Sequence, residues 1–281
     1  MSEPRCAVGL PNVGDYADPE LLVSLGVLAE QSGWDGVFFW DHLAYTDSWP
    51  ATDPYVVVSA LVARTNRIRT GVMVSQLARR RPWKLARETV TLDVLSGGRL
   101  AVGVGLGSTP HEEYEVFGED GDARVRADRL DEGLEIMCGL WSGEPFSFAG
   151  RYYQVTDTVF SPPPVQRPRI PIWVGGRWPA RRPFRRAARY DGVFPTFEGI
   201  GHADRPSPAQ LSEVVEYVRG LRASDAGPFD VVVEAQSEGP APEAVAAYGA
   251  VGLTWWIEKL GWFRGPVQHV RERIQAGPPT G

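Results

Sequence analysis

Patterns typical of buried strands and of amphipathic helices alternate along the whole chain. Short apolar runs bounded by glycine, proline or charged residues are typical of strands buried on both faces of a parallel sheet. Such runs predict strands at about residues 6–10, 37–40, 68–74, 100–105, 170–174, 192–195, 229–234 and 253–257. The segments between and after them have helical spacing, at about residues 19–32, 54–64, 82–96, 124–141, 179–190, 208–222, 242–249 and 266–274. This alternation predicts parallel strand pairing with helical crossovers.

Eight strand–helix units in 281 residues are what a (β/α)8 barrel requires. A doubly wound open sheet is the alternative, and it predicts a glycine-rich dinucleotide turn after the first strand. Residues 10–14 form no such turn, and the glycine-rich run at 103–108 lies at the fourth strand and lacks the last glycine of the motif. We therefore expect an α/β fold, a TIM barrel in a single domain over residues 1–281. Residues 146–160 are expected to form an insertion between the fourth helix and the fifth strand.

Composition and charge exclude several classes of protein. The formal net charge of −6 argues against a general nucleic-acid binder. No window is long and apolar enough to span a bilayer, and the first residues do not resemble a signal peptide, so we expect no membrane contact and a cytoplasmic location. Cys6 and Cys138 are expected to be free thiols. The four histidines are scattered without the spacing of metal ligands, so no metal site is expected.

Two polar residues end the second predicted strand. Asp41 and His42 directly follow the apolar run at 37–40. In parallel α/β folds, the carboxyl ends of the strands are where ligands bind. We therefore expect His42 to face an active site, with Asp41 orienting its imidazole ring. A histidine that is hydrogen-bonded for structural reasons alone is the alternative.

Two further stretches suggest anion binding. Gly175 and Gly176 end the fifth predicted strand and precede a helix rich in arginine, so backbone N–H groups and the helix dipole are expected to favour an anion there. The arginines of that helix are candidates for bidentate contacts. A turn followed by a solvated helix face is the alternative. The second basic run, at 79–81, is either a contact for a charged ligand tail or a solvated loop.

Several longer segments carry a family resemblance. They are residues 33–42, 65–72, 92–107, 124–143 and 171–176. Together they resemble the bacterial luciferase-like monooxygenases, a family that includes oxidoreductases using FMN or the deazaflavin coenzyme F420. The resemblance covers most of the chain and implies the same barrel fold that the strand count predicts.

The resemblance also implies which residues form the site. His42 is similar to an active-site histidine beside the reactive edge of the flavin-type ring. The third strand is implied to carry a bulge with a non-proline cis peptide behind that ring, near Val72, Met73 and Val74. The other positions that the resemblance places near the cofactor are Gly107, Ser108, Gly175, Gly176 and Arg177.

Two positions depart from the family pattern. Leu106 stands where luciferase has an arginine that contacts the FMN phosphate, and this departure favours F420 over FMN. Ser108 stands where sugar-phosphate enzymes of the deazaflavin branch carry an acid, although Glu112 or Glu113 is a candidate replacement. The second departure argues against transferring the substrate of those enzymes to this chain.

The sequence thus predicts an F420-dependent oxidoreductase that transfers hydride to or from a small organic substrate. One alternative is an FMN-dependent monooxygenase that uses O2 and receives reduced flavin from a separate reductase. Another is a flavin-binding barrel without catalytic activity. The resemblance further implies a homodimer.

Overall fold

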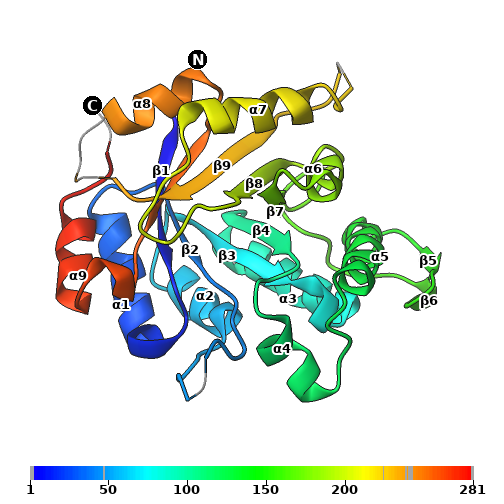
Figure 1. The fold of residues 1–281 in the computed structure, drawn as a ribbon. Coiled ribbons are helices and arrows are strands. Elements are labelled where there is room, and N and C mark those ends of the chain that lie inside the picture. Colours follow the sequence, from blue (N-terminus) through cyan, green and yellow to red (C-terminus); the bar gives the residue numbers. More distant parts are fainter. Residues whose placement is uncertain (1–2, 47, 224, 238, 240–242, 280–281) are drawn as a thin grey trace.

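Parallel strands close into a barrel at the centre of the molecule (Figure 1). The computed structural model describes residues 3–46, 48–223, 225–237, 239 and 243–279. Around the barrel the strand order is β1-β10-β9-β8-β7-β4-β3-β2. The strands are β1 Arg5–Leu10, β2 Gly36–Phe39, β3 Arg69–Gln76, β4 Leu100–Gly105, β7 Ile172–Trp178, β8 Gly192–Phe197, β9 Asp230–Ala235 and β10 Trp255–Lys259. The predicted TIM barrel is confirmed.

Helices surround the barrel and connect its strands (Figure 1). They are α1 Pro19–Gln31, α2 Pro54–Val62, α3 Pro82–Ser96, α4 Pro110–Glu113, α5 Ala123–Trp141, α6 Arg181–Ala187, α7 Pro208–Arg219, α8 Glu243–Ala250 and α9 Val267–Gln275. Pro242, the predicted first residue of one helix, lies outside the described residues. None of the helices described has the length and apolar character needed to cross a membrane.

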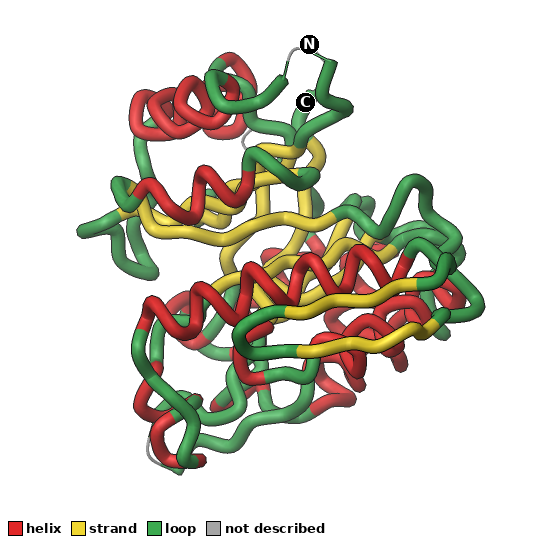
Figure 2. Tube along the Cα trace, turned by 90° about the vertical axis from the view of Figure 1, so that its right-hand side faces the viewer, coloured by secondary structure: helices red, strands yellow, loops and turns green. Residues whose placement is uncertain are grey.

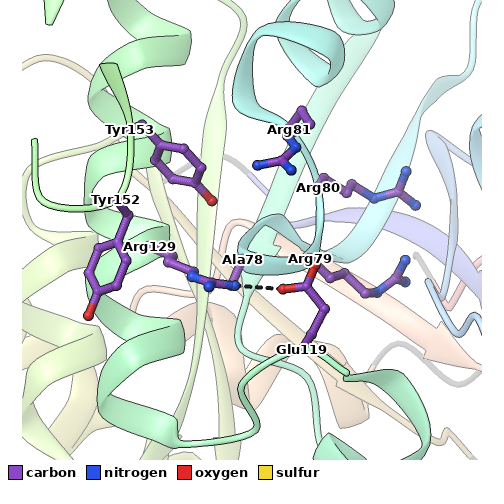
Figure 3. Close-up of a pocket in the computed structure, with 8 residues that line it drawn as sticks. All are labelled: Ala78, Arg79, Arg80, Arg81, Glu119, Arg129, Tyr152 and Tyr153. Atoms are coloured by element: carbon purple, nitrogen blue, oxygen red, sulfur yellow. Dashed lines mark hydrogen bonds and ion pairs between the residues drawn. The ribbon is translucent and has the colours of Figure 1, made fainter. Parts of the chain in front are cut away.

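The predicted insertion is an antiparallel hairpin between α5 and β7. Its strands are β5 Phe146–Ala149 and β6 Gln154–Thr158, and they lie along α5 (Figure 2). The hairpin turn is held by the carboxylate of Glu132, which accepts hydrogen bonds from the backbone N–H groups of Arg151, Tyr152 and Tyr153 at 2.8, 3.0 and 3.0 Å. Tyr152 and Tyr153 line one side of a cleft of about 150 Å³ between the hairpin, α5 and the segment after β3 (Figure 3).

Several elements differ from those predicted, and two of the differences bear on the site. The strand β7 continues through Gly175 and Gly176 to Trp178, because residues 175–178 pair with residues 194–197 of β8. The glycines therefore lie inside a strand and do not begin a helix. The short helix α4 occupies part of a segment expected to be loop, and it carries Glu113.

Large rings fill the amino-terminal half of the barrel. Phe38, Trp173 and Trp255 contact one another there, with ring centroids 5.3 to 6.1 Å apart. Since side chains alternate between the two faces of a strand, the residue two positions later on each strand also points inward. On β1 the residue two positions after the inward-facing Ala7 is Gly9, and on β7 the residue two positions after Trp173 is Gly175. Because neither glycine has a side chain, these two strands leave space in the carboxyl-terminal half of the barrel.

A bulge in β3 uses the space that Gly175 and Gly105 leave. The pairing register between β3 and β4 shifts between Val72 and Ser75, and the Met73–Val74 peptide bond is cis. Both features are those that the family resemblance implied. A Cβ atom at Gly105 would lie 2.6 Å from a methyl carbon of Val74, and one at Gly175 would lie 2.9 Å from its other methyl carbon. Because Gly105 and Gly175 have no side chains, the side chain of Val74 can pack inside the barrel mouth.

The two cysteines are free, as expected. Cys6 lies in the core, and burial raises the pKa of its thiol to about 12. Cys138 is half-buried, and burial raises its pKa to about 11. Neither thiol is ionised near neutral pH, so neither is a nucleophile there.

Candidate active site

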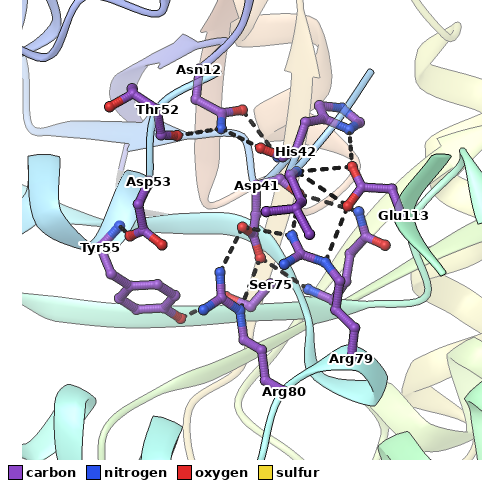
Figure 4. A network of polar contacts seen from close by, with 12 residues as sticks. Asn12, Asp41, His42, Thr52, Asp53, Tyr55, Ser75, Arg79, Arg80 and Glu113 are labelled. Carbon is purple, nitrogen blue, oxygen red and sulfur yellow. Dashed lines mark hydrogen bonds and ion pairs between the residues drawn. The ribbon is translucent and has the colours of Figure 1, made fainter. Parts of the chain in front are cut away.

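The imidazole of His42 is held by a carboxylate from a distant part of the chain (Figure 4). Its Nδ1 atom lies 2.9 Å from Oε1 of Glu113, which is 1% exposed on α4. The backbone of His42 is also fixed, because its N–H donates to Oδ1 of Asn12 at 3.0 Å and its carbonyl accepts from Nδ2 of Asn12 at 2.8 Å. The ring therefore has a defined position just after β2, at the barrel mouth.

This contact decides which ring nitrogen is free for chemistry. A carboxylate accepts a hydrogen bond, so Glu113 favours the tautomer of His42 with its proton on Nδ1. The lone pair of Nε2 then remains available to take a proton from a ligand. Glu113 was one of two candidate replacements for the missing acid at Ser108, and the structure places it rather than Glu112 against the histidine.

Asp41 does not orient His42, contrary to the expectation. Successive residues of an extended chain point in opposite directions, so the two side chains diverge. The carboxylate of Asp41 instead lies 2.8 Å from Nη2 of Arg79 and 2.7 Å from Nη2 of Arg80. Burial alone would raise the pKa of Asp41, but Arg80 and Arg79 outweigh it and hold that pKa below its usual range. Asp41 is therefore an ionised anchor for two arginines.

Arg79 joins the histidine and aspartate contacts into one network. Its Nε atom lies 3.2 Å from Oε2 of Glu113, while its Nη2 atom reaches Asp41. Arg80 also lies over the ring of Tyr55, with 5.1 Å between its Cζ atom and the ring centroid. The basic run at 79–81 is therefore no fully solvated loop, since two of its members are tied to carboxylates beneath the site.

The same arginines form one wall of the cleft in Figure 3. Arg129 lies on the opposite side, and its Nη1 atom donates to Oε2 of Glu119 at 2.7 Å. Three of the four arginines around the cleft thus have carboxylate partners in Asp41, Glu113 or Glu119. Most of the positive charge of the cleft is neutralised by the protein itself.

A polar group without a partner lies on the glycine-rich side of the mouth. The side-chain oxygen of Gln76 is buried and accepts no hydrogen bond from the residues that the structure describes. Gly107 lies next to it with φ +76°, and a Cβ atom there would fall 2.2 Å from the Gln76 side chain. A buried acceptor that lacks a donor is costly unless a ligand supplies one. Gln76 therefore offers an unused acceptor next to Gly107.

The predicted phosphate site lacks its predicted surroundings. Gly176 lies within β7, where a Cβ atom would approach Cβ of Pro183 to 2.3 Å. Two arginines of α6 contact acids of α5, and one of them, Arg186, donates from Nη2 to Asp131 at 2.9 Å. Arg182 also pairs with Asp131, at 3.0 Å. The expected bidentate contacts from these two arginines to a ligand are wrong, because both are used to pack α6 against α5.

The sequence reasoning missed a group of aromatic residues on the other side of the mouth. They are Trp40, Tyr45, Trp49, His202, Trp262 and Phe263. The feature of the sequence that could have revealed this group is the number of aromatic residues that follow three of the predicted strands. Trp40 donates from Nε1 to the partly buried carboxyl of Glu234 at 3.0 Å. Burial raises the pKa of Glu234, although Lys259 opposes this change.

Comparison with known proteins identifies the family. Residues 6–236 match the family described as luciferase-like monooxygenase. The chain belongs to this family. It is 30% identical to an F420-dependent glucose-6-phosphate dehydrogenase of Beutenbergia cavernae, over 93% of this chain and 77% of that protein. It is 29% identical to the oxygenase component of a flavin-dependent trigonelline monooxygenase of Acinetobacter baylyi, over 58% of this chain and 44% of that protein.

A solved structure shows the same fold. The F420-dependent secondary alcohol dehydrogenase in complex with an F420–acetone adduct superposes with a TM-score of 0.76, at 16% identity, over 98% of this chain and 99% of that one. As a member of the luciferase-like family, the chain is an oxidoreductase or monooxygenase. Its relatives use F420 or FMN.

Proposed function

We propose that this luciferase-like enzyme transfers hydride between coenzyme F420 and a small organic substrate. The observation that carries the proposal is the His42–Glu113 pair, which holds a proton acceptor at the barrel mouth beside the bulge of β3. Leu106 in place of an arginine supports F420 over FMN, as do relatives named as F420-dependent enzymes.

Residues on the glycine-rich side of the mouth would hold the cofactor. They are Val72, Met73, Val74, Gln76, Gly107, Ser108, Gly175, Gly176 and Arg177. Val74 offers an apolar contact for one ring face, and the unpaired oxygen of Gln76 offers an acceptor for a ring N–H group. When bound, F420 supplies the carbon that accepts or returns the hydride.

His42 moves the proton that accompanies the hydride. Its Nε2 atom accepts the proton when a substrate hydroxyl becomes a carbonyl, and it returns the proton in the reverse direction. Glu113 keeps Nδ1 protonated and stabilises the imidazolium that forms. Asp41 acts indirectly, as a positioning residue, because it holds Arg79 against Glu113.

Two measurements test this function. The first titrates the purified protein with F420 and with FMN and follows the quenching of its tryptophan fluorescence. F420 is expected to bind more tightly, and binding of neither cofactor would remove the proposal. The second measures turnover of His42→Ala, for which we expect a loss of about 100-fold or more with cofactor affinity changed only severalfold. Turnover at the wild-type level would exclude a role for His42.

The FMN-dependent monooxygenase remains the second candidate. It is favoured by the similarity to the oxygenase component of trigonelline monooxygenase, a name that suggests a separate reductase as partner. Tighter binding of FMN, with O2 consumption that depends on an added flavin reductase, would favour it. Binding of a cofactor without turnover under any of these conditions would instead indicate a flavin-binding barrel.

The remaining expectations are part of the same proposal. We expect residues 1–281 to fold as a single domain, since β1 near one end of the chain pairs with β10 near the other. We also expect a cytoplasmic homodimer. Light scattering on the purified protein measures its mass in solution and would contradict the dimer if it gave 30.9 kDa.

A further inference from the structure

One side of the barrel mouth is lined by rings that we call the aromatic wall, defined as Trp40, Tyr45, Trp49, His202, Trp262 and Phe263. These residues come from four parts of the chain: the end of β2, the loop after it, the loop after β8 and the loop after β10. The glycines and the β3 bulge lie on the other side of the mouth. The two sides therefore differ in chemistry. One side offers the apolar side chain of Val74 and the unpaired oxygen of Gln76, whereas the other offers aromatic rings.

The rings nearest the barrel are almost parallel. His202 and Phe263 have centroids 5.2 Å apart and planes inclined by 8°. Trp40 lies 5.6 Å from His202 at 25° and 6.3 Å from Phe263 at 19°. Aromatic pairs prefer offset stacking, so these three rings hold one another in place at the barrel mouth.

The aromatic wall begins at the proposed proton carrier. The ring centroid of Tyr45 lies 4.6 Å from that of His42, and Trp40 lies 6.1 Å from it. Tyr45 continues the surface outward to Trp49 and Trp262, at 5.9 and 5.7 Å. A substrate whose reacting oxygen is within hydrogen-bond reach of His42 would therefore lie close to Tyr45 and Trp40.

The outer rings are also accessible to a ligand. Trp49 is 38% exposed, and the neighbouring Leu43 is 51% exposed. Large apolar side chains that face water at the mouth of a site are typical of a surface that a ligand covers.

Two cations beside the aromatic wall face protein carboxylates. Lys259 has its Nζ atom 3.9 Å from Oε2 of Glu234 and 5.9 Å from the ring centroids of both Trp40 and Phe263. Arg264 points to the other side, where its Nη2 atom lies 3.3 Å from Oε1 of Glu258. A phosphate group at this wall would have to compete with carboxylates for both cations.

We propose that the aromatic wall is the substrate subsite, and that the substrate is a planar, uncharged aromatic carbonyl compound or the corresponding alcohol. This inference rests on the proposed F420-dependent function and narrows its substrate class. In the reducing direction the carbonyl carbon gains a hydride while reduced F420 is oxidised, and the carbonyl oxygen gains a proton from the imidazolium of His42. The product is the alcohol, and a phosphorylated sugar is excluded as substrate.

Calorimetric titration tests the subsite without turnover. The protein is saturated with oxidised F420 and titrated with 2-acetylnaphthalene, a planar ketone that cannot accept hydride from the oxidised cofactor. Wild-type protein is expected to bind this ketone and to show no binding of glucose 6-phosphate under the same conditions. Trp49→Ala is expected to weaken ketone binding about fivefold or more, and Trp49→Phe to keep it within about threefold, because the lost contact is a stacked ring.

Trp83→Ala is the matched control. Trp83 has the same 38% exposure as Trp49 but lies on α3, where its ring contacts Tyr153. Its substitution is expected to leave ketone binding unchanged. Equal effects of the two alanine variants, or binding of glucose 6-phosphate more tightly than of the ketone, would overturn the inference.

The F420 titration separates this inference from the proposed function. Protein that binds neither F420 nor FMN would contradict the function itself. Protein that binds F420 with the expected affinity but does not bind 2-acetylnaphthalene would contradict only the substrate class. Melting temperatures of the three variants, compared with that of the wild type, show whether a change in ketone affinity arises from unfolding.

Discussion

At the scale of single residues, the site depends on one buried carboxylate that receives several donors. Glu113 accepts from Nδ1 of His42 and from the backbone N–H of Leu43, and it pairs with Nε of Arg79. Both of its oxygens are therefore used as acceptors. A neutral amide cannot replace it fully, because one end of the amide would have to face a donor.

We predict that Glu113→Gln lowers kcat by about 10- to 100-fold with a smaller change in KM, because the imidazolium of His42 loses its charged partner. Nitrogen NMR of the histidine ring is expected to show increased protonation of Nε2 in the neutral ring. Glu112→Gln is the control, since the structure gives Glu112 no contact with His42 and its kcat should stay at the wild-type level. An unchanged tautomer and kcat in Glu113→Gln would contradict the assignment of Glu113.

Asp41 belongs to the same network but is predicted to affect stability. Asp41→Asn leaves Arg80 without its buried counter-charge and leaves Arg79 with Glu113 alone, so we expect the free energy of unfolding to fall by about 3 kcal/mol. Urea denaturation measures this change. Glu88→Gln removes the exposed Lys84–Glu88 pair and should change stability by less than about 1 kcal/mol. Equal effects of the two variants would show that the buried pairing contributes little.

At the scale of elements, the glycines of β4 and β7 make the bulge of β3 possible. Gly105 and Gly175 face the two methyl groups of Val74, and Gly103 faces the sulfur of Met73. The glycine-rich run at 103–107 is therefore explained in large part by packing between strands. We therefore expect this run to affect cofactor binding indirectly, because it makes room for the bulge of β3.

We predict that Gly105→Ala destabilises the protein by about 1–3 kcal/mol, because the new methyl group would lie 2.6 Å from a carbon of Val74 and the packed mouth must shift. Thermal denaturation measures the stability, and the fluorescence titration should show weaker F420 binding. The control is Gly227→Ala, where a Cβ atom meets nothing within 4 Å. If Gly105→Ala left both stability and F420 affinity unchanged, the bulge would not depend on this glycine.

At the scale of the whole molecule, ion-paired carboxylates connect distant elements. Asp41 links the end of β2 to the segment after β3, and Asp131 links α5 to α6. Burial opposes ionisation of Asp131, but hydrogen bonds from Arg186 and Arg182 lower its pKa. Both aspartates thus have lower pKa values in the folded protein than in the unfolded chain.

The stability of the molecule should consequently fall in acid. A carboxyl group with a lowered pKa in the folded state contributes its full stabilisation above its unfolded pKa of about 3.9, and loses it as the pH falls through the folded value. We expect the urea midpoint to decrease as the pH is lowered below about 4, and to decrease less steeply in Asp41→Asn. A midpoint that is independent of pH in this range would contradict the lowered pKa values.

Local pattern was sufficient to predict the barrel and the place of His42. Continuous apolar runs and stripes with helical spacing arise from burial of nearby residues, so they are visible in a short window of sequence. The end of β7 was harder to predict, because glycine has a low propensity for strands and the pattern therefore ended the strand at Gly175 and Gly176. Pairing with β8 overrides that propensity and extends the strand to Trp178.

The sequence by itself determined the fold class, the strand that precedes His42 and the family to which the chain belongs. Only the tertiary structure decided that Glu113, 71 residues away, orients His42, and that Asp41 serves two arginines instead. It also gathered the aromatic wall from segments that are far apart in the chain. The physical reason is that the barrel brings the carboxyl ends of all its strands to one face, so contacts between their loops depend on closure of the sheet and not on local pattern.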